Sequence, residues 1–207
     1  MFPPGPPFHG IDWDDALENH PACSRVLTKS ALAVEVWLKV QAPSTLLTLG
    51  IVEGLHSALF QGLFPYFAGR LRGEAPRYLP SNVDFGNRKA TRYEDVPLEC
   101  QTLFLRLEAL IRQLDQLEQT MGRPDFEEEV LKVACYAHCE VIRIHPFRNG
   151  NGRACINYFA RRYGMLPVPF ERPKGNYLDA NRSWMDRQRI EHMMDVIRPF
   201  WKRNPLP

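Results

Sequence analysis

Residues 145–153, which read HPFRNGNGR, hold the side chains of this chain that are best suited to catalysis. They bring together an imidazole at His145, the glycines Gly150 and Gly152, and a permanent cation at Arg153. An imidazole titrates near neutral pH, so His145 can act as a general base toward an attacking hydroxyl. The spacing therefore indicates a base directly beside a glycine-flanked turn.

The turn that follows His145 has the features of a phosphate site. Gly150 and Gly152 let the backbone approach a ligand closely. If a helix begins there, its first amides lack partners within the helix, and together with the helix dipole they attract an anion. Arg153 opposes that dipole unless an anion lies between them, and Asn151 can donate to phosphate oxygens. The alternative is a plain turn between two core helices, but the histidine and arginine that flank the turn favour a ligand site.

A base and a phosphate loop need rigid helices on both sides, and the apolar periodicity predicts them. The expected helices cover residues 25–40, 44–60, a segment after Pro97 that ends before Gly122, a segment from Asp125 to the motif, a segment from Gly150 to Tyr163, and residues 178–201. The helix that leads into His145 is apolar on more than one side, so we expect it to be central. We expect Phe147 to pack inward and fix the loop.

The helix after Pro97 carries a single stripe of leucines at steps of three and four. Its members are Leu103, Leu107, Leu110, Leu114 and Leu117. A stripe of barely two heptads favours a helix that faces the core over a coiled coil. Between residues 71 and 96 the helical pattern stops, and short β-tolerant pieces predict a hairpin with its turn near residues 86–87.

The bulk composition describes one folded domain with a proline-rich arm. The chain has 207 residues, of which 44% are hydrophobic, and its net charge is +2. That charge balance argues against general binding of nucleic acid or membrane. We expect residues 1–20 to be a flexible arm and residues 21–207 to form the domain. The N-terminus lacks the pattern of a signal peptide, so the protein is expected in the cytoplasm, or exported without a cleavable signal.

Several further residues have a functional and a structural interpretation. Cys135, His138 and Cys139 have the helical spacing of metal ligands, but their apolar surroundings favour a core patch. The five cysteines show no disulfide framework, which favours reduced thiols. In the last predicted helix, Trp184 can contact a nucleotide base or simply pack in the core.

The motif resembles the signature of the Fic (Fido) family, His-x-Phe-x-acid-Gly-Asn-Gly-Arg-x-x-Arg. The flanking segments are similar too: residues 55–60 and 64–72 look like the family's helix and its following AG-x-x-R element, and residues 177–180 look like the segment that borders the nucleotide base. This resemblance implies a mainly α fold, a Fic-type helical bundle with a short β-hairpin flap and a core of about residues 50–200.

The resemblance also implies an enzyme, a protein adenylyltransferase that moves AMP from ATP to a Ser, Thr or Tyr hydroxyl of a target protein, which can be the enzyme itself. His145 would be the catalytic base, and Mg²⁺ would assist. The residues implied for the nucleotide and its phosphates are Phe147, Asn149, Gly150, Asn151, Gly152, Arg153 and Tyr177. Those implied for docking the target are Val83, Asp84, Phe85 and Gly86.

Two positions depart from the family signature. Asn149 stands where the family has an acid that ligates Mg²⁺, and an uncharged amide oxygen should bind the metal more weakly. Ile156 replaces the second arginine, and Glu53-Gly54 lacks the preceding Ser or Thr of the family's inhibitory motif. The alternatives are a degenerate nucleotide- or protein-binding module, transfer from another donor (UMP, phosphocholine or phosphate), and control by a separate inhibitory protein.

Overall fold

A computed structural model gives the fold of the chain. It describes residue 29 and residues 45–62, 68–74, 83–85, 88–147, 151, 153–168 and 175–205. The predicted arm, nearly all of the predicted helix 25–40, and the motif residues Asn149, Gly150 and Gly152 lie outside the described residues, as do Gly86 and the side chains of Phe85 and Arg153.

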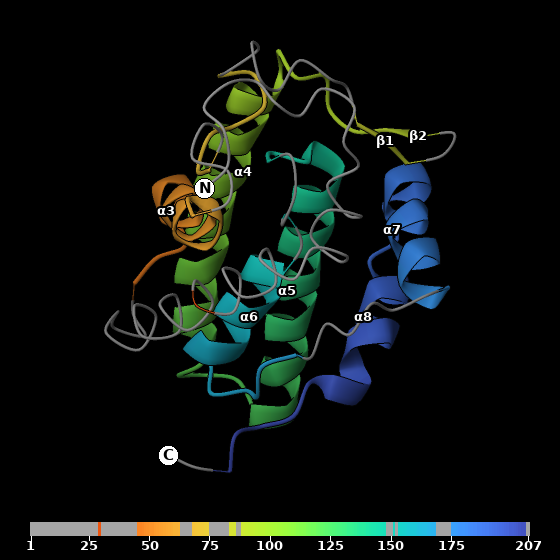
Figure 1. The fold of residues 1–207 in the computed structure, drawn as a ribbon. Helices are drawn as coiled ribbons and strands as arrows, with labels where there is room; N and C mark the ends of the chain where they lie inside the picture. The colour runs from red at the N-terminus through yellow and green to blue at the C-terminus, as the bar shows by residue number, and fades with distance from the viewer. Residues whose placement is uncertain are drawn as a thin grey trace.

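The described part is a bundle of helices with one small hairpin (Figure 1). This arrangement confirms the predicted mainly α fold. In chain order the elements are α3 (Leu49–Phe60), β1 (Asp84–Phe85), β2 (Arg88–Lys89), α4 (Val96–Leu117), α5 (Arg123–Ile144), α6 (Arg153–Arg162), α7 (Asn176–Arg187), α8 (Glu191–Ile197) and a 3-10 turn (Arg198–Phe200).

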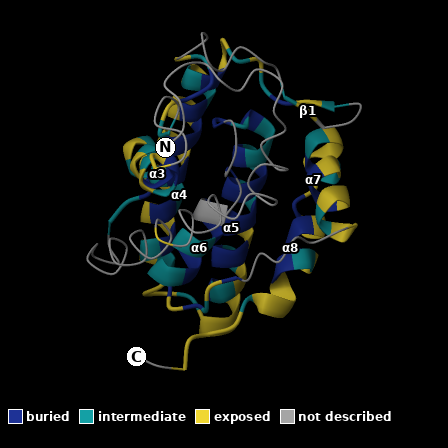
Figure 2. Cartoon of the chain, viewed as in Figure 1, coloured by how far each residue is buried: buried dark blue, intermediate teal, exposed yellow. Residues whose placement is uncertain are grey.

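Helix α5 is the central element, as its apolar pattern predicted. One side, with Val130, Ala134 and Val141, packs into a core shared with α4 and α6. Another side, with Leu131 and Cys135, packs into a second core shared with α7 and α8. Figure 2 shows this helix buried along much of its length. Because α5 is held on both sides, its C-terminal end is a firm support for the motif that follows it.

Helix α4 faces the core, as its leucine stripe predicted. Leu103, Leu107 and Leu114 are buried in the core shared with α5. The helix can begin at Val96 with Pro97 in its first turn, because the N–H that proline lacks is not needed there. The same property of Pro124 lets α5 begin at Arg123, two residues before the predicted start.

Two other helix boundaries differ from the prediction. Helix α3 begins at Leu49 rather than at residue 44, because the Thr48 hydroxyl caps the amide of Ile51 at 3.3 Å. The single helix predicted over residues 178–201 is wrong. Gln188 adopts a left-handed backbone with φ 52° and ends α7, and its N–H donates to the Trp184 carbonyl. The chain then restarts as α8, which buries Met193 against α5.

Among the described residues, no helix is both long enough and apolar enough to cross a membrane.

Candidate active site

His145 ends helix α5 in an unusual backbone conformation. It adopts the left-handed region, with φ 53° and ψ 60°. In the described part of the chain, Gln188 is the only other non-glycine residue with positive φ. Such a conformation costs a β-carbon-bearing residue about 1 kcal/mol, and it persists where surrounding contacts impose it. The half-buried His145 is therefore held in place by the fold.

Two hydrogen bonds close the turn behind His145. The Asn151 amide oxygen accepts from the backbone N–H of Phe147, and its amide nitrogen donates to the Phe147 carbonyl, both at 2.7 Å. The Asn151 side chain is buried. Both polar atoms of the Asn151 amide therefore bind the backbone of the turn, a role that the sequence did not indicate. Asn151 shapes the loop from inside.

The ring of Phe147 anchors the same turn in the protein core. It is 1% exposed and stacks on His56 of α3, with ring centroids 4.0 Å apart and planes inclined by 14°. The inward packing expected from the sequence is confirmed. A ring buried in this way supports the loop from the protein interior.

His56 is a buried residue of α3 whose contacts with the motif the sequence alone did not reveal. Its Nδ1 accepts the backbone N–H of Gly69 at 2.9 Å, so that nitrogen carries no proton. Gly69 has φ 75°, and a β-carbon there would lie 2.8 Å from the Glu53 carbonyl oxygen. The glycine of the AG-x-x-R element is therefore needed where it stands, and His56 connects that element to Phe147.

The arginine of the same element, Arg72, is buried at 1% exposure. Its Nε donates to the His145 carbonyl at 2.6 Å, and its Nη2 donates to the carbonyls of Ile144 and Thr91, each at 2.8 Å. Its backbone N–H donates to the Pro146 carbonyl at 2.8 Å. These bonds to the backbone of residues 144–146 could not be read from the sequence.

The predicted hairpin is present. Strands β1 and β2 pair antiparallel with Asp84 opposite Lys89 and Phe85 opposite Arg88, and the N–H of Ala90 donates to the Val83 carbonyl at 2.9 Å. Residues 86–87, where the turn was predicted, lie outside the described residues. The root of the hairpin meets the motif, because the N–H of Thr91 donates to the Arg143 carbonyl at 3.1 Å.

An ion pair connects the hairpin to helix α7. Arg88 of β2 binds both carboxylate oxygens of Asp186, with the Nε–Oδ1 distance at 2.6 Å. Figure 1 shows the hairpin lying next to one end of α7. Hydrogen bonding to Arg88 lowers the pKa of Asp186, so the pair is charged at neutral pH.

We predict that Asp186→Ala frees the hairpin without unfolding the protein. The amide of Ala90 should exchange with solvent several-fold faster, because the hairpin loses its contact with α7. Hydrogen exchange checks this. Asp179→Ala is the matched control, since Asp179 pairs with Arg182 inside α7 at 3.0 Å. Equal exchange of Ala90 in both variants would show that the ion pair does not hold the hairpin.

Tyr177, expected near the nucleotide base, lies in the first turn of α7. Its hydroxyl is 2.9 Å from Nε2 of His138, a fully buried residue of α5. One turn later, the Asn181 amide nitrogen donates to the Tyr177 carbonyl at 3.0 Å. These contacts fix the orientation of the Tyr177 ring relative to α5, the helix that ends in His145.

Trp184 packs in the core, which was one of its two predicted interpretations. It is buried, its indole N–H donates to Glu140 at 2.9 Å, and its ring meets Tyr136 edge to face. Glu140 also binds Arg143, which pairs in turn with Glu99 of α4 at 2.5 Å. This network joins α4, α5 and α7 around the root of the hairpin.

Ile156, which stands in place of the family's second arginine, is fully buried in the core next to α7 and α8. Arg162, later on the same helix, pairs with Asp115 of α4 at 2.7 Å. Its cation is therefore engaged with α4. Nothing in these contacts places Arg162 where it could substitute for the missing arginine.

The cysteines in the described part are buried free thiols. Burial raises the pKa of Cys155, which follows the motif, to about 12, and it raises the pKa of Cys135 and Cys139 as well. These thiols are therefore protonated near neutral pH and poorly suited to bind metal or attack a substrate. The core interpretation of Cys135, His138 and Cys139 fits their burial.

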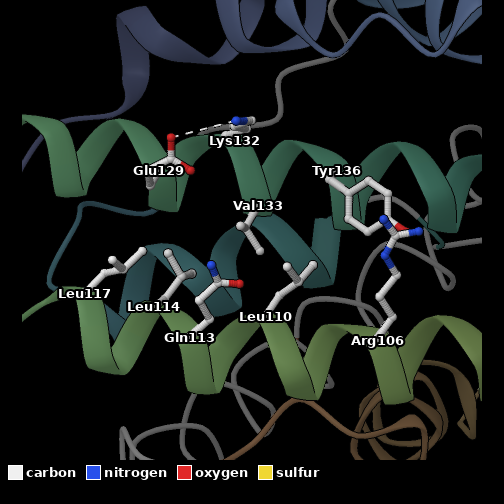
Figure 3. Close-up of a pocket in the computed structure, with 9 residues that line it drawn as sticks. All are labelled: Arg106, Leu110, Gln113, Leu114, Leu117, Glu129, Lys132, Val133 and Tyr136. Atoms are coloured by element: carbon white, nitrogen blue, oxygen red, sulfur yellow. Dashed lines mark ion pairs between the residues drawn. The ribbon is translucent and has the colours of Figure 1, made fainter.

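A separate groove lies between α4 and α5, with a cavity volume of about 240 Å³. Leu110, Leu114 and Val133 form its apolar floor, and Arg106 lies over the Tyr136 ring at one end (Figure 3). None of the motif residues that the structure describes lines it. We therefore do not assign the groove to the active site.

The chain is similar to known proteins in its sequence profile and in its fold. The sequence profile of the Fic/DOC family matches residues 46–160. No curated protein is significantly similar in sequence.

Several solved structures share the fold. One is the N-terminal Fic domain of a Bartonella quintana cell filamentation protein, a VirB-translocated Bep effector, with bound ADP. It is 19% identical, the match covers 95% of this chain and 90% of that one, and the TM-score is 0.63. BepC of Bartonella tribocorum, with bound AMPPNP, is 18% identical over 88% and 89% of the chains, with a TM-score of 0.59. The Fic domain of a Bep effector from Bartonella sp. AR 15-3 is 18% identical over 95% and 85%, with a TM-score of 0.64.

Proposed function

Because the chain belongs to the Fic/DOC family, as the resemblance in its motif predicted, we propose that it is a nucleotidyltransferase that moves AMP from ATP to a hydroxyl of a protein. The observation that carries this proposal is the position of His145. It ends a rigid, central helix, and the chain continues through a closed turn to the first residue of α6, Arg153. The two solved relatives with bound ADP and AMPPNP support a nucleotide as the ligand.

The phosphates would lie at the N-terminal end of α6. Backbone amides at a helix start and the helix dipole together favour an anion. Gly150, Gly152 and Arg153 are the residues we propose to hold the phosphates, with the turn shaped by Asn151 from inside. We propose that Tyr177 lies beside the base, since its ring is already fixed against α5.

In the proposed reaction, His145 is the general base. Its imidazole takes the proton of a Ser, Thr or Tyr hydroxyl, and the oxygen attacks the α-phosphorus of ATP. The bond from the α-phosphorus to the bridging oxygen breaks, and pyrophosphate leaves. Preorganised amides would stabilise the charge that develops on the phosphate oxygens. A bound Mg²⁺ would neutralise part of the same charge.

We propose that the hairpin aligns the target. An extended peptide can add to an exposed strand edge through backbone hydrogen bonds. The root of the hairpin, at Thr91, bonds to the last turn of α5. A peptide paired with Val83 or Asp84 would therefore be held relative to His145.

Two labelled forms of ATP test this function. The protein is incubated with a panel of candidate target proteins, Mg²⁺, and ATP labelled either on the α- or on the γ-phosphate. AMP transfer predicts α-label on protein and no γ-label. γ-Label on protein would instead indicate phosphoryl transfer, and labelled UTP or CDP-choline tests the other donors. A labelled band at the enzyme's own mass identifies self-modification.

A binding module is the second candidate function, and the buried Ile156 in place of an arginine favours it. Such a module predicts nucleotide binding with no label on protein from any donor. Isothermal titration with a non-hydrolysable ATP analogue detects the binding. Transfer of α-label would exclude this second candidate.

We predict that Asn149→Asp lowers the Mg²⁺ concentration needed for half-maximal transfer by roughly tenfold, since a carboxylate adds charge to a hard-cation site. Without Mg²⁺ the same variant should be slower than wild type, because the added charge repels phosphate. A Mg²⁺ titration of the transfer rate measures both effects. Asn204→Asp, which adds the same charge near the C-terminus, is the control. An unchanged Mg²⁺ titration would remove residue 149 from the metal site.

A further inference from the structure

The buried Arg72 bonds to two segments that the proposed function uses separately. Its guanidinium donates to the Thr91 carbonyl at the root of the hairpin and to the Ile144 and His145 carbonyls at the end of α5. We propose that Arg72 is a positioning residue that makes the target-docking hairpin and the catalytic base one rigid unit. The assignment of both segments rests on the proposed function.

A planar guanidinium is suited to this task. It presents five donors in a fixed geometry, so a single group can bind several carbonyls at set angles. The donors here reach residues 19 and 73 positions away in the chain. The backbone N–H of Arg72 adds a bond to the Pro146 carbonyl. The arginine therefore contacts the backbone on both sides of the bond between His145 and Pro146.

Burial of a cation is costly unless its donors are satisfied. This cost favours the one arrangement of the backbone in which the carbonyls around Arg72 accept its hydrogen bonds. Burial lowers the pKa of Arg72, but an arginine remains protonated at neutral pH. The carbonyl oxygens that it binds must then stay in place around the charge. One consequence is that the left-handed backbone of His145 is fixed by the Nε–carbonyl bond of 2.6 Å.

Arg143 makes a second connection between the hairpin root and α5. This residue of α5 donates to the Thr91 hydroxyl at 3.3 Å, and its carbonyl accepts the N–H of Thr91. The buried Arg72 and the partly exposed Arg143 thus both join the hairpin root to the last turn of α5. Movement of the hairpin alone would break the bonds of Thr91 to both arginines.

Hydrogen exchange tests the coupling without any need for activity. In wild-type protein, the amides of Thr91 and His145 should open together under mild denaturant, with the same free energy and the same denaturant dependence. In Arg72→Lys both should exchange about tenfold faster or more, because an ammonium cannot reproduce the planar set of bonds. Arg92→Lys is the matched control, since the exposed Arg92 side chain pairs with the neighbouring Glu94 at 3.5 Å. It should leave both amides unchanged.

A kinetic comparison completes the test. For Arg72→Lys we expect kcat of AMP transfer to fall about 100-fold, as a small misplacement of a base can do, with the KM for ATP within about twofold of wild type. Independent opening of Thr91 and His145 in wild type would overturn the inference, whether or not the variant folds. Unchanged exchange of both amides, or unchanged kcat, in Arg72→Lys would also overturn it. If wild-type protein transfers no label, the proposed function fails and the exchange comparison alone decides.

Discussion

Replacing His145 with alanine is expected to reduce the rate of AMP transfer by ~10²–10⁴-fold, the usual contribution of a general base. The loss should appear in kcat, with the affinity for nucleotide close to that of wild type, because the proposed phosphate contacts come from residues after the turn. Label transfer from α-labelled ATP measures the rate, and titration with a non-hydrolysable analogue measures the affinity.

The left-handed backbone of His145 calls for a second variant. Asparagine tolerates this conformation better than alanine does but cannot act as a base. His145→Asn should therefore be as inactive as His145→Ala while keeping wild-type stability. His192→Ala, which removes an exposed imidazole from α8, should remain fully active. Substantial transfer by both His145 variants would contradict the assignment of the base.

Phe147→Ala is expected to lower the free energy of unfolding by ~3–5 kcal/mol, the range for loss of a buried phenylalanine from a packed core. The ring is 1% exposed and stacked on His56, so its removal leaves a cavity under the motif. Urea unfolding followed by circular dichroism measures the change. Under conditions in which the variant is still folded, its transfer rate should also be lower than that of wild type, because the turn after His145 loses its support.

Phe200→Ala is the matched control for this prediction. The same group is removed from a ring that is 45% exposed, so the free energy of unfolding should change by less than about 1 kcal/mol. Similar losses for the two variants would show that Phe147 does not carry the packing that its burial indicates.

Regular helices were the part of the fold that could be predicted. The stripe of leucines in α4 and the two apolar sides of α5 repeat at short sequence intervals, and burial follows such patterns directly. The break after α7 could not be predicted in this way. Gln188 carries the left-handed conformation there, and glutamine gives no signal of a helix end as glycine would.

The sequence proposes residues for the candidate site, but it does not show which residues hold them in place. His145 and the hairpin followed from local sequence. The roles of Arg72 and His56 depend on contacts with Thr91, Ile144, His145 and Phe147, which are distant in the chain. The position of Asn151 in the motif suggested phosphate binding, and the sequence held no sign that its amide also binds the backbone of the turn on both sides.

The most direct measurement is a crystal structure of the protein with Mg²⁺ and a non-hydrolysable ATP analogue. We expect the phosphates to lie on the backbone amides of residues 150–153, with the α-phosphorus facing the His145 imidazole and the base beside Tyr177. An analogue bound in the groove between α4 and α5, or phosphates on a different surface with His145 turned away from them, would contradict the proposed function.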